Sequence, residues 1–184
     1  MKIFVSVFVA AVLMASGATG KSAQLRRSPE FAFTIPGQGE HLLSQYRGKV
    51  VALGFILTTC PHCQAESKVM NRMQQRFGSQ GFQALYVAVD PNAGLMVDNF
   101  AKDFHVGFPV GWSSMDHMMD YMGFTDRPAV PQLVLIDRQG NIHYETARVP
   151  DASDLQEETI ASRIQELIAA GNRSKPRAGE SGAR

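Results

Sequence analysis

The chain has 184 residues, of which 45% are apolar, and its 18 lysines and arginines nearly balance 17 aspartates and glutamates, giving a formal net charge of +1. This composition excludes a mainly disordered chain, which would combine low hydrophobicity with high net charge, and a nucleic-acid binder held by bulk positive charge. Two cysteines are too few for a disulfide-stapled miniprotein, and the length suits one domain with a full core.

The first twenty residues have the pattern of a secretory signal peptide. Lys2 supplies a positive charge, residues 3–15 are almost all apolar, and residues 16–20 are small. Cleavage after Ala18 and cleavage after Gly20 both fit this pattern. A buried first helix and an uncleaved membrane anchor are the alternatives, although the apolar run is short for a membrane span. We therefore predict an exported, periplasmic protein whose cysteines meet an oxidising compartment.

The chain after residue 20 is predicted to begin with a polar lead-in over residues 21–30. A short strand is predicted at 31–35 and a brief helical turn at 42–47. Residues 49–57 form an apolar run without clean alternation, which is typical of a strand buried on both faces of a sheet.

A helix is predicted at 61–77, because Val69, Met73 and Phe77 recur at a spacing of four and Gly78 follows. The later predicted elements, in chain order, are a strand at 82–89, helices at 95–104 and 113–121, a strand at 132–137, a hairpin strand at 142–147 and a helix at 152–170. The tail at 171–184, rich in Gly, Ser, Arg and Pro, is predicted to be disordered. This order predicts an α/β fold with a central mixed sheet flanked by helices.

The motif Cys60-Pro61-His62-Cys63 stands between a predicted buried strand and a predicted helix. The end of the strand places Cys60 at the carboxyl edge of the sheet, where open α/β sheets place their sites. The start of the helix directs free N–H groups and a positive dipole end at its sulfur, which favours the nucleophilic thiolate. Pro61 suits the first helical turn. We predict that Cys60 attacks a substrate and that Cys63, almost one turn later, resolves the mixed disulfide.

His62 lies between the two cysteines and is predicted to tune their reduction potential. An imidazole beside the nascent thiolate adds a hydrogen-bond donor, and a positive charge when protonated. Both stabilise the reduced form, which makes the disulfide more oxidising. Known couples run from about −270 mV for thioredoxin to about −120 mV for DsbA, a range of roughly 7 kcal/mol.

The motif and its surroundings resemble the exported bacterial thiol–disulfide oxidoreductases of the TlpA/ResA-like group, in the AhpC/TSA-redoxin superfamily. The tetrad of the motif is similar to that of DsbA, whereas the frame around it is TlpA-like. The resemblance implies a thioredoxin-like domain over residues 31–170, with an N-terminal extension and a helical insert. Besides the cysteine motif, the matching positions are Leu43, Tyr46-Arg47-Gly48-Lys49-Val50-Val51, Phe55, Val130-Pro131 and Leu135-Ile136-Asp137-Arg138-Gln139-Gly140.

The resemblance also implies roles for residues outside the cysteine motif. It implies a cis peptide bond between Val130 and Pro131 that faces the cysteines and leaves the Val130 backbone free to pair with a client strand. An ordinary trans proline at a strand start is the alternative. It implies that Glu66, three residues after Cys63, takes the thiol proton. A solvated helix residue is the alternative for Glu66.

The sequence departs from the family pattern at one position that bears on clients. Thr58-Thr59 precede Cys60, where the family usually has an aromatic residue, most often Trp. The change removes a flat docking surface and leaves the client preference open. The single tryptophan, Trp112, falls in the predicted helical insert. The direction of transfer is also open, because His62 argues for an oxidant and the TlpA-like frame for a reductase recharged by a membrane partner.

The sequence also contains residues that could form a metal site instead of a redox site. The residues Met115, Met118, Met119 and Met122 recur at helical spacing around His117, which predicts an apolar stripe rather than a copper box. A metallochaperone that holds Cu(I) on the two cysteines is the non-enzymatic alternative. A zinc site is disfavoured, because zinc prefers four ligands and the chain has only two cysteines. A peroxiredoxin is disfavoured as well, because the sequence pattern that precedes the reactive cysteine of peroxiredoxins is absent. We expect the protein to need no cofactor and to hold no resident metal. We also expect it to be a monomer and not to bind nucleic acid. The expected partners are client proteins with thiols or disulfides and a membrane redox partner.

Overall fold

The structure is a computed structural model and describes residues 25–173. The predicted signal peptide at 1–20, the start of the predicted lead-in and most of the predicted tail lie outside the described residues. Within residues 25–173, every helix is too short or too polar to cross a membrane.

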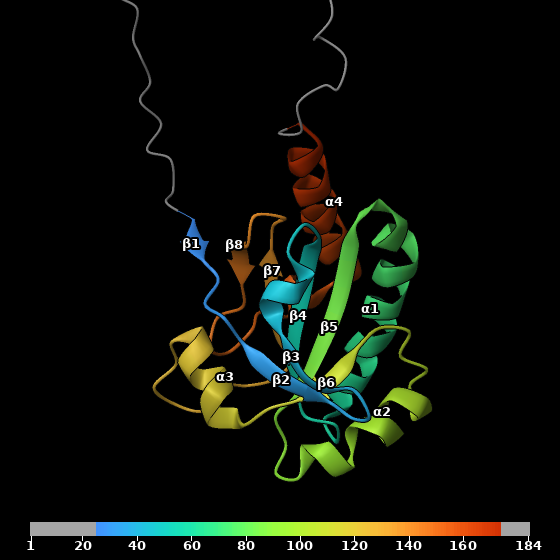
Figure 1. The fold of residues 1–184 in the computed structure, drawn as a ribbon, viewed down its shortest axis with the longest axis vertical. Coiled ribbons are helices and arrows are strands. Elements are labelled where there is room, and N and C mark those ends of the chain that lie inside the picture. The colour runs from blue at the N-terminus through green and yellow to red at the C-terminus, as the bar shows by residue number, and fades with distance from the viewer. Residues whose placement is uncertain (1–24, 174–184) are drawn as a thin grey trace, which may run out of the picture.

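One mixed sheet and four α-helices make up the described part of the chain (Figure 1). The strands are β1 (Arg26–Arg27), β2 (Ala32–Ile35), β3 (Gly39–Leu42), β4 (Val50–Ile56), β5 (Phe82–Ala88), β6 (Val110–Trp112), β7 (Gln132–Ile136) and β8 (Asn141–Glu145). The helices are α1 (Pro61–Phe77), α2 (Val97–Asp103), α3 (Met115–Met122) and α4 (Glu157–Arg173). The strand order is β1-β8-β7-β4-β5-β6-β2-β3.

Strand β4 lies inside the sheet, parallel to β5 and antiparallel to β7. All seven of its residues are buried, which confirms the prediction of a strand covered on both faces. Because successive side chains of a strand point to opposite faces, β4 contributes to two separate core clusters. Val50, Ala52 and Ile56 belong to one cluster, and Val51, Leu53 and Phe55 belong to the other.

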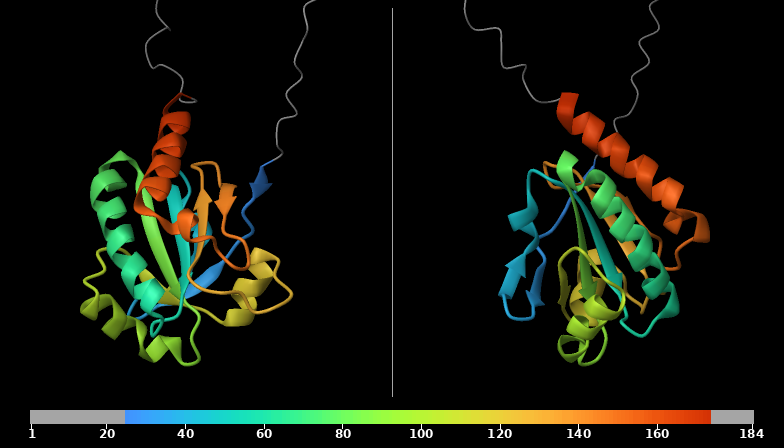
Figure 2. Two further views of the ribbon diagram at one scale, coloured as in Figure 1. Left: turned by 180° about the vertical axis from the view of Figure 1, so that it is seen from behind. Right: turned by 90° about the vertical axis from the view of Figure 1, so that its right-hand side faces the viewer.

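The two clusters correspond to the two layers that cover the sheet. Helices α1, α2 and α4 supply apolar side chains to the first cluster, and α3 and β2 supply them to the second. Figure 2 shows α1 and α4 on one side of the sheet and the β2–β3 hairpin on the other. This arrangement confirms the predicted thioredoxin-like α/β fold.

The long helices agree with the sequence prediction apart from their ends. Helix α1 has the predicted bounds, and its buried residues recur every three or four positions, as a helix with one covered face requires. Helix α4 begins at Glu157, after a separate 3-10 turn at Ala152–Leu155, and continues to Arg173, three residues into the predicted tail.

Three short strands were not predicted from the sequence. Strand β1 lies within the predicted lead-in and pairs with β8, and β3 forms a hairpin with β2. Strand β6 carries Trp112 and lies between α2 and α3, in the region of the predicted helical insert. Each of these strands has only two to four residues and lacks an apolar run. Tertiary pairing rather than local pattern therefore decides them.

Gly54 of β4 faces Tyr86 of β5 across the parallel ladder. A Cβ atom at position 54 would lie 2.5 Å and 2.7 Å from two carbons of the Tyr86 ring. The ring is fully buried, and its edge-to-face partner Phe108 has its centroid 5.0 Å away. Position 54 therefore has no room for a side chain while Tyr86 keeps its place.

We predict that Gly54→Ala lowers the free energy of unfolding by about 1–3 kcal/mol, because overpacking forces the ring or the backbone to shift. Urea unfolding followed by circular dichroism measures the change. Gly107→Ala is the matched control, since the nearest atom to its Cβ would be 3.7 Å away. Equal stabilities for the two variants would contradict the prediction.

Candidate functional site

The two cysteines lie at the start of α1 and differ in exposure. Cys60 is the N-cap residue and is partly exposed, while Cys63 in the first turn is fully buried. Both are in the reduced form, and they lie 3.4 Å apart. Burial raises the pKa of the Cys63 thiol well above its usual value, and the nearby Cys60 and Glu66 act in the same direction. A partner protein can therefore reach Cys60 directly, whereas Cys63 is shielded.

The loop that leads from β4 to Cys60 is held by Asp90, at the end of β5. The Asp90 carboxylate accepts hydrogen bonds from the backbone N–H of Thr58, at 2.8 Å, and from its hydroxyl, at 3.1 Å. The Gln64 amide donates to the Thr58 carbonyl at 3.0 Å. This contact between Asp90 and Thr58 was not predicted from the sequence, because the two residues are far apart in the chain.

The Val130–Pro131 peptide bond is cis, as the resemblance implied, and it lies beside the first cysteine. The Cys60 Sγ is 3.9 Å from the Val130 carbonyl oxygen. The buried side chain of Gln132 donates to the carbonyls of Ala129, at 2.6 Å, and Ala147, at 3.2 Å, and it also contacts Thr146. Gln132 thus anchors the loop, and its polar side chain in an apolar strand was the sequence signal that could have found it.

Glu66 is buried on the inner face of α1, so the alternative of a solvated helix residue is wrong. Only 5% of it is exposed, and neither carboxylate oxygen has a hydrogen-bond partner among the described residues. Burial raises the pKa of this carboxyl to about 8, and the neighbouring Tyr86 hydroxyl opposes the rise. Leaving a buried polar group unpaired costs about 1–3 kcal/mol. Such a cost at one turn from Cys63 is typical of a functional rather than a structural group.

The other predicted residues of the motif are at the surface. Pro61 occupies the first position of α1, and His62 is exposed, with no hydrogen bond from its side chain to any described residue. The tuning role of His62 therefore stays a prediction.

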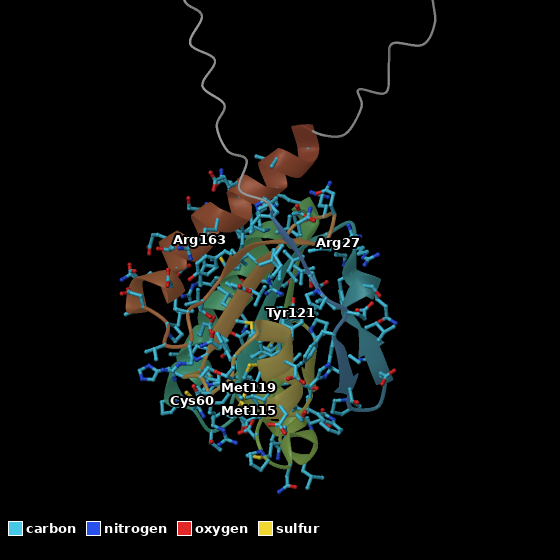
Figure 3. The ribbon with its side chains drawn as sticks, turned by 90° about the vertical axis from the view of Figure 1, so that its left-hand side faces the viewer. Arg27, Cys60, Met115, Met119, Tyr121 and Arg163 are labelled. Atoms are coloured by element: carbon cyan, nitrogen blue, oxygen red, sulfur yellow. The ribbon has the colours of Figure 1, made fainter. Side chains whose placement is uncertain are left out.

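The methionine stripe of α3 is a packing feature, as predicted. Met118 and Met122 are buried, while Met115 and Met119 are half-buried against the same core cluster. His117 stacks on the Phe31 ring, with a centroid distance of 4.3 Å. Figure 3 shows Met115 and Met119 at the same end of the molecule as Cys60. Within residues 25–173, no group of three or more His, Cys, Asp or Glu residues is placed to hold a metal ion.

One hollow adjoins the loop that carries Cys60, and a second adjoins Asp90, which holds that loop. One, of about 350 Å³, is lined by Thr58, Thr59 and Met96, among others. The other, of about 720 Å³, is lined by Asp90, Leu95, Trp112 and Met115, among others. Leu95 is 83% exposed and Trp112 is 38% exposed. The surface at this second hollow therefore presents apolar side chains, although no aromatic residue precedes Cys60.

The buried carboxyl predicts how stability depends on pH. Between the ordinary pKa of 4.5 and the folded value of about 8, the carboxyl is ionised in the unfolded state and mostly protonated in the folded state, so folding loses stability as pH rises through this window. Glu66→Gln removes this loss. The stability of the variant relative to wild type should rise by on the order of 3–5 kcal/mol between pH 4.5 and pH 8.5.

Urea unfolding of the reduced proteins at several pH values measures this difference. Glu158→Gln is the control, because it removes an exposed carboxylate of α4. If the Glu66→Gln and wild-type curves stay parallel across the window, the carboxyl is not held in its protonated form by the fold.

Relatives of this chain are thiol–disulfide oxidoreductases by name. ResA from Geobacillus kaustophilus is 34% identical over 116 residues, which cover 62% of this chain and 64% of the relative. ResA from Bacillus subtilis is 32% identical over 100 residues, 54% of each chain. These matches span less than two thirds of the length of the curated relatives.

Solved structures share the fold. A Chlorobium tepidum protein provisionally named thiol:disulfide interchange protein DsbE superposes with a TM-score of 0.67 at 26% identity, covering 78% of this chain and 96% of its own. A thiol:disulfide interchange protein from Bacteroides sp. has a TM-score of 0.65 at 15% identity, covering 86% and 95%. The AhpC/TSA family matches residues 26–145, which include both cysteines and Val130-Pro131. The chain therefore belongs to the AhpC/TSA family.

Proposed function

We propose that this protein is an exported thiol–disulfide oxidoreductase of the ResA/DsbE type, which exchanges disulfides with client proteins through Cys60 and Cys63. One observation carries the proposal: a reachable cysteine and a shielded cysteine lie 3.4 Å apart at the start of a helix, with a backbone carbonyl beside the reachable sulfur. The names of the relatives support the same chemistry.

In the reducing direction, the Cys60 thiolate attacks a client disulfide. A Cys60–client disulfide forms, the client S–S bond breaks, and one client sulfur leaves as a thiolate that takes up a proton. Cys63 then gives its thiol proton to the Glu66 carboxylate and attacks the Cys60 sulfur. The Cys60–Cys63 bond forms, the second client sulfur leaves, and two electrons have passed to the client. The oxidising direction is the reverse of these steps.

The client backbone is proposed to pair at the Val130 carbonyl, in the manner of an added strand. That carbonyl lies beside the Cys60 sulfur, so a strand paired there would bring its own sulfur to Cys60. The exposed Leu95 and Trp112 give apolar client side chains a place to pack. They would replace the aromatic residue that the family usually has before the first cysteine.

The reduction potential of the Cys60–Cys63 pair decides whether the protein oxidises or reduces its clients. Titration of metal-free protein in glutathione buffers would give a value near −120 mV for an oxidant, or near −270 mV for a reductase that needs a membrane electron donor. Absence of reversible exchange together with tight Cu(I) binding would replace the proposed function with the metallochaperone. Export to the periplasm and a monomeric state belong to the same proposal.

We predict that Cys63→Ser accumulates a mixed disulfide with a disulfide-containing test protein such as insulin, because attack proceeds and resolution does not. Non-reducing electrophoresis and mass spectrometry detect the adduct. Cys60→Ser is the matched control and should yield at least about tenfold less adduct, since Cys63 is buried. Equal adduct from both variants would reverse the assignment of the two cysteines.

A second prediction concerns His62. Replacement by Ala should make the potential more negative by about 30–60 mV, the effect of losing one or two interactions of about 1.4 kcal/mol with the reduced form. His105→Asn is the control, because His105 is exposed and Asn tolerates its positive φ of 53°. A potential that does not move, or moves to more positive values, would remove His62 from the tuning role.

A further inference from the structure

Three buried oxygen atoms beneath the cysteines lack hydrogen-bond partners in the described structure. They are the two carboxylate oxygens of Glu66, on α1, and the hydroxyl of Tyr86, on β5. The two residues are neighbours, since each perturbs the pKa of the other: the hydroxyl lowers that of the carboxyl, and the carboxylate raises that of the phenol. Buried polar groups in folded proteins are nearly always paired. Two unpaired groups of complementary type side by side therefore point to each other as partners.

The position of the Tyr86 ring depends on residues from neighbouring elements. Gly54 of β4 leaves room for the ring, because a Cβ atom at this position would lie only 2.5 Å from a ring carbon. Phe108 packs edge-on against the ring, and Phe100 of α2 lies at 6.5 Å between centroids. The ring belongs to the core cluster that also contains Cys63, under α1. Packing thus holds the hydroxyl on the side of the sheet where Glu66 lies.

We propose that Tyr86 is a positioning residue for the proton acceptor of the site, whose hydroxyl donates a hydrogen bond to the Glu66 carboxylate. The inference rests on the proposed function, in which Glu66 takes the proton of Cys63. Tyr86 itself exchanges no proton, because burial raises the pKa of its phenol well above the usual value and keeps the hydroxyl a donor. The hydroxyl stabilises the ionised carboxyl, which is the form that can accept the thiol proton.

The surroundings offer Glu66 no other ionic partner among the described residues. Cys63 of α1 and Tyr86 of β5 are the titratable groups that interact with it, and Cys60 adjoins Cys63. The nearby charged residues of the helices are engaged or exposed at the surface: Arg72 of α1 pairs with Glu157 of α4, Arg163 of α4 pairs with Asp154, and Lys102 and Asp103 of α2 are exposed. A neutral hydroxyl is therefore the group left to support the carboxylate.

The test is a direct titration of the Glu66 carboxyl by carbon-13 NMR, on the reduced full-length protein after removal of any signal peptide. Glu66→Gln assigns the resonance. The midpoint in wild type is expected at about pH 8. In Tyr86→Phe it should rise by about one pH unit, a tenfold change in proton affinity, because the donor is lost while the ring stays.

Tyr121→Phe is the matched control. It also removes a buried tyrosine hydroxyl, one that contacts Ser28 at 2.8 Å, but it lies in the core cluster on the other face of the sheet. Its midpoint should equal that of wild type. An unchanged midpoint in Tyr86→Phe, or an equal rise in Tyr121→Phe, would overturn the inference.

A second measurement needs no variant at position 86, so it holds even where Tyr86→Phe does not fold. In wild type labelled at tyrosine Cζ, the Tyr86 resonance should shift with the same midpoint as the Glu66 carboxyl, and in Glu66→Gln this shift should vanish. A Tyr86 resonance that ignores the carboxyl titration would also overturn the inference. Neither measurement involves disulfide exchange, so failure of the proposed function in the trapping experiment is seen separately.

Discussion

The structure depends on the burial of β4 on both faces of the sheet. Six of its seven residues divide between two core clusters, so one short strand joins the layer of α1 and α4 to the layer of α3 and the β2–β3 hairpin. Burial on this scale is the main favourable term in folding. Because the strand cannot move without opening both clusters, its carboxyl end is a fixed support, and the chain turns there from sheet to helix at Cys60.

The site uses this rigid support to place groups with opposite requirements within one turn of helix. Cys60 must be reached by a partner, whereas Cys63 and Glu66 are kept from water. The two loops that meet at the cysteines are held by polar side chains of the sheet ends, Asp90 on one side and Gln132 on the other. These hydrogen bonds fix the backbone where chemistry would occur, so that no large conformational change is needed to bring the sulfur and the Val130 carbonyl together.

The core beneath the cysteines is adapted to the site as well as to packing. A glycine in a strand buried on both faces forms no side-chain contacts with the core, and a tyrosine hydroxyl in the core loses its hydration. These two residues, Gly54 and Tyr86, occupy facing positions of the ladder, and the Tyr86 hydroxyl neighbours the Glu66 carboxyl. A core built for stability alone would fill position 54 and use an apolar ring at position 86, so their combination is best understood through the carboxyl above them.

Local patterns in the chain were enough to predict the elements with strong signals and the chemistry of the motif. The apolar run of β4, the period of α1 and the sequence Cys60-Pro61-His62-Cys63 sufficed, because burial on both faces, helical spacing and a Pro-initiated helix are local properties. Strands β1, β3 and β6, the anchoring by Asp90 and Gln132, and the meeting of Glu66 with Tyr86 became visible only in the folded molecule. Each joins residues distant in the chain, and no local pattern records which distant groups share a low-dielectric interior.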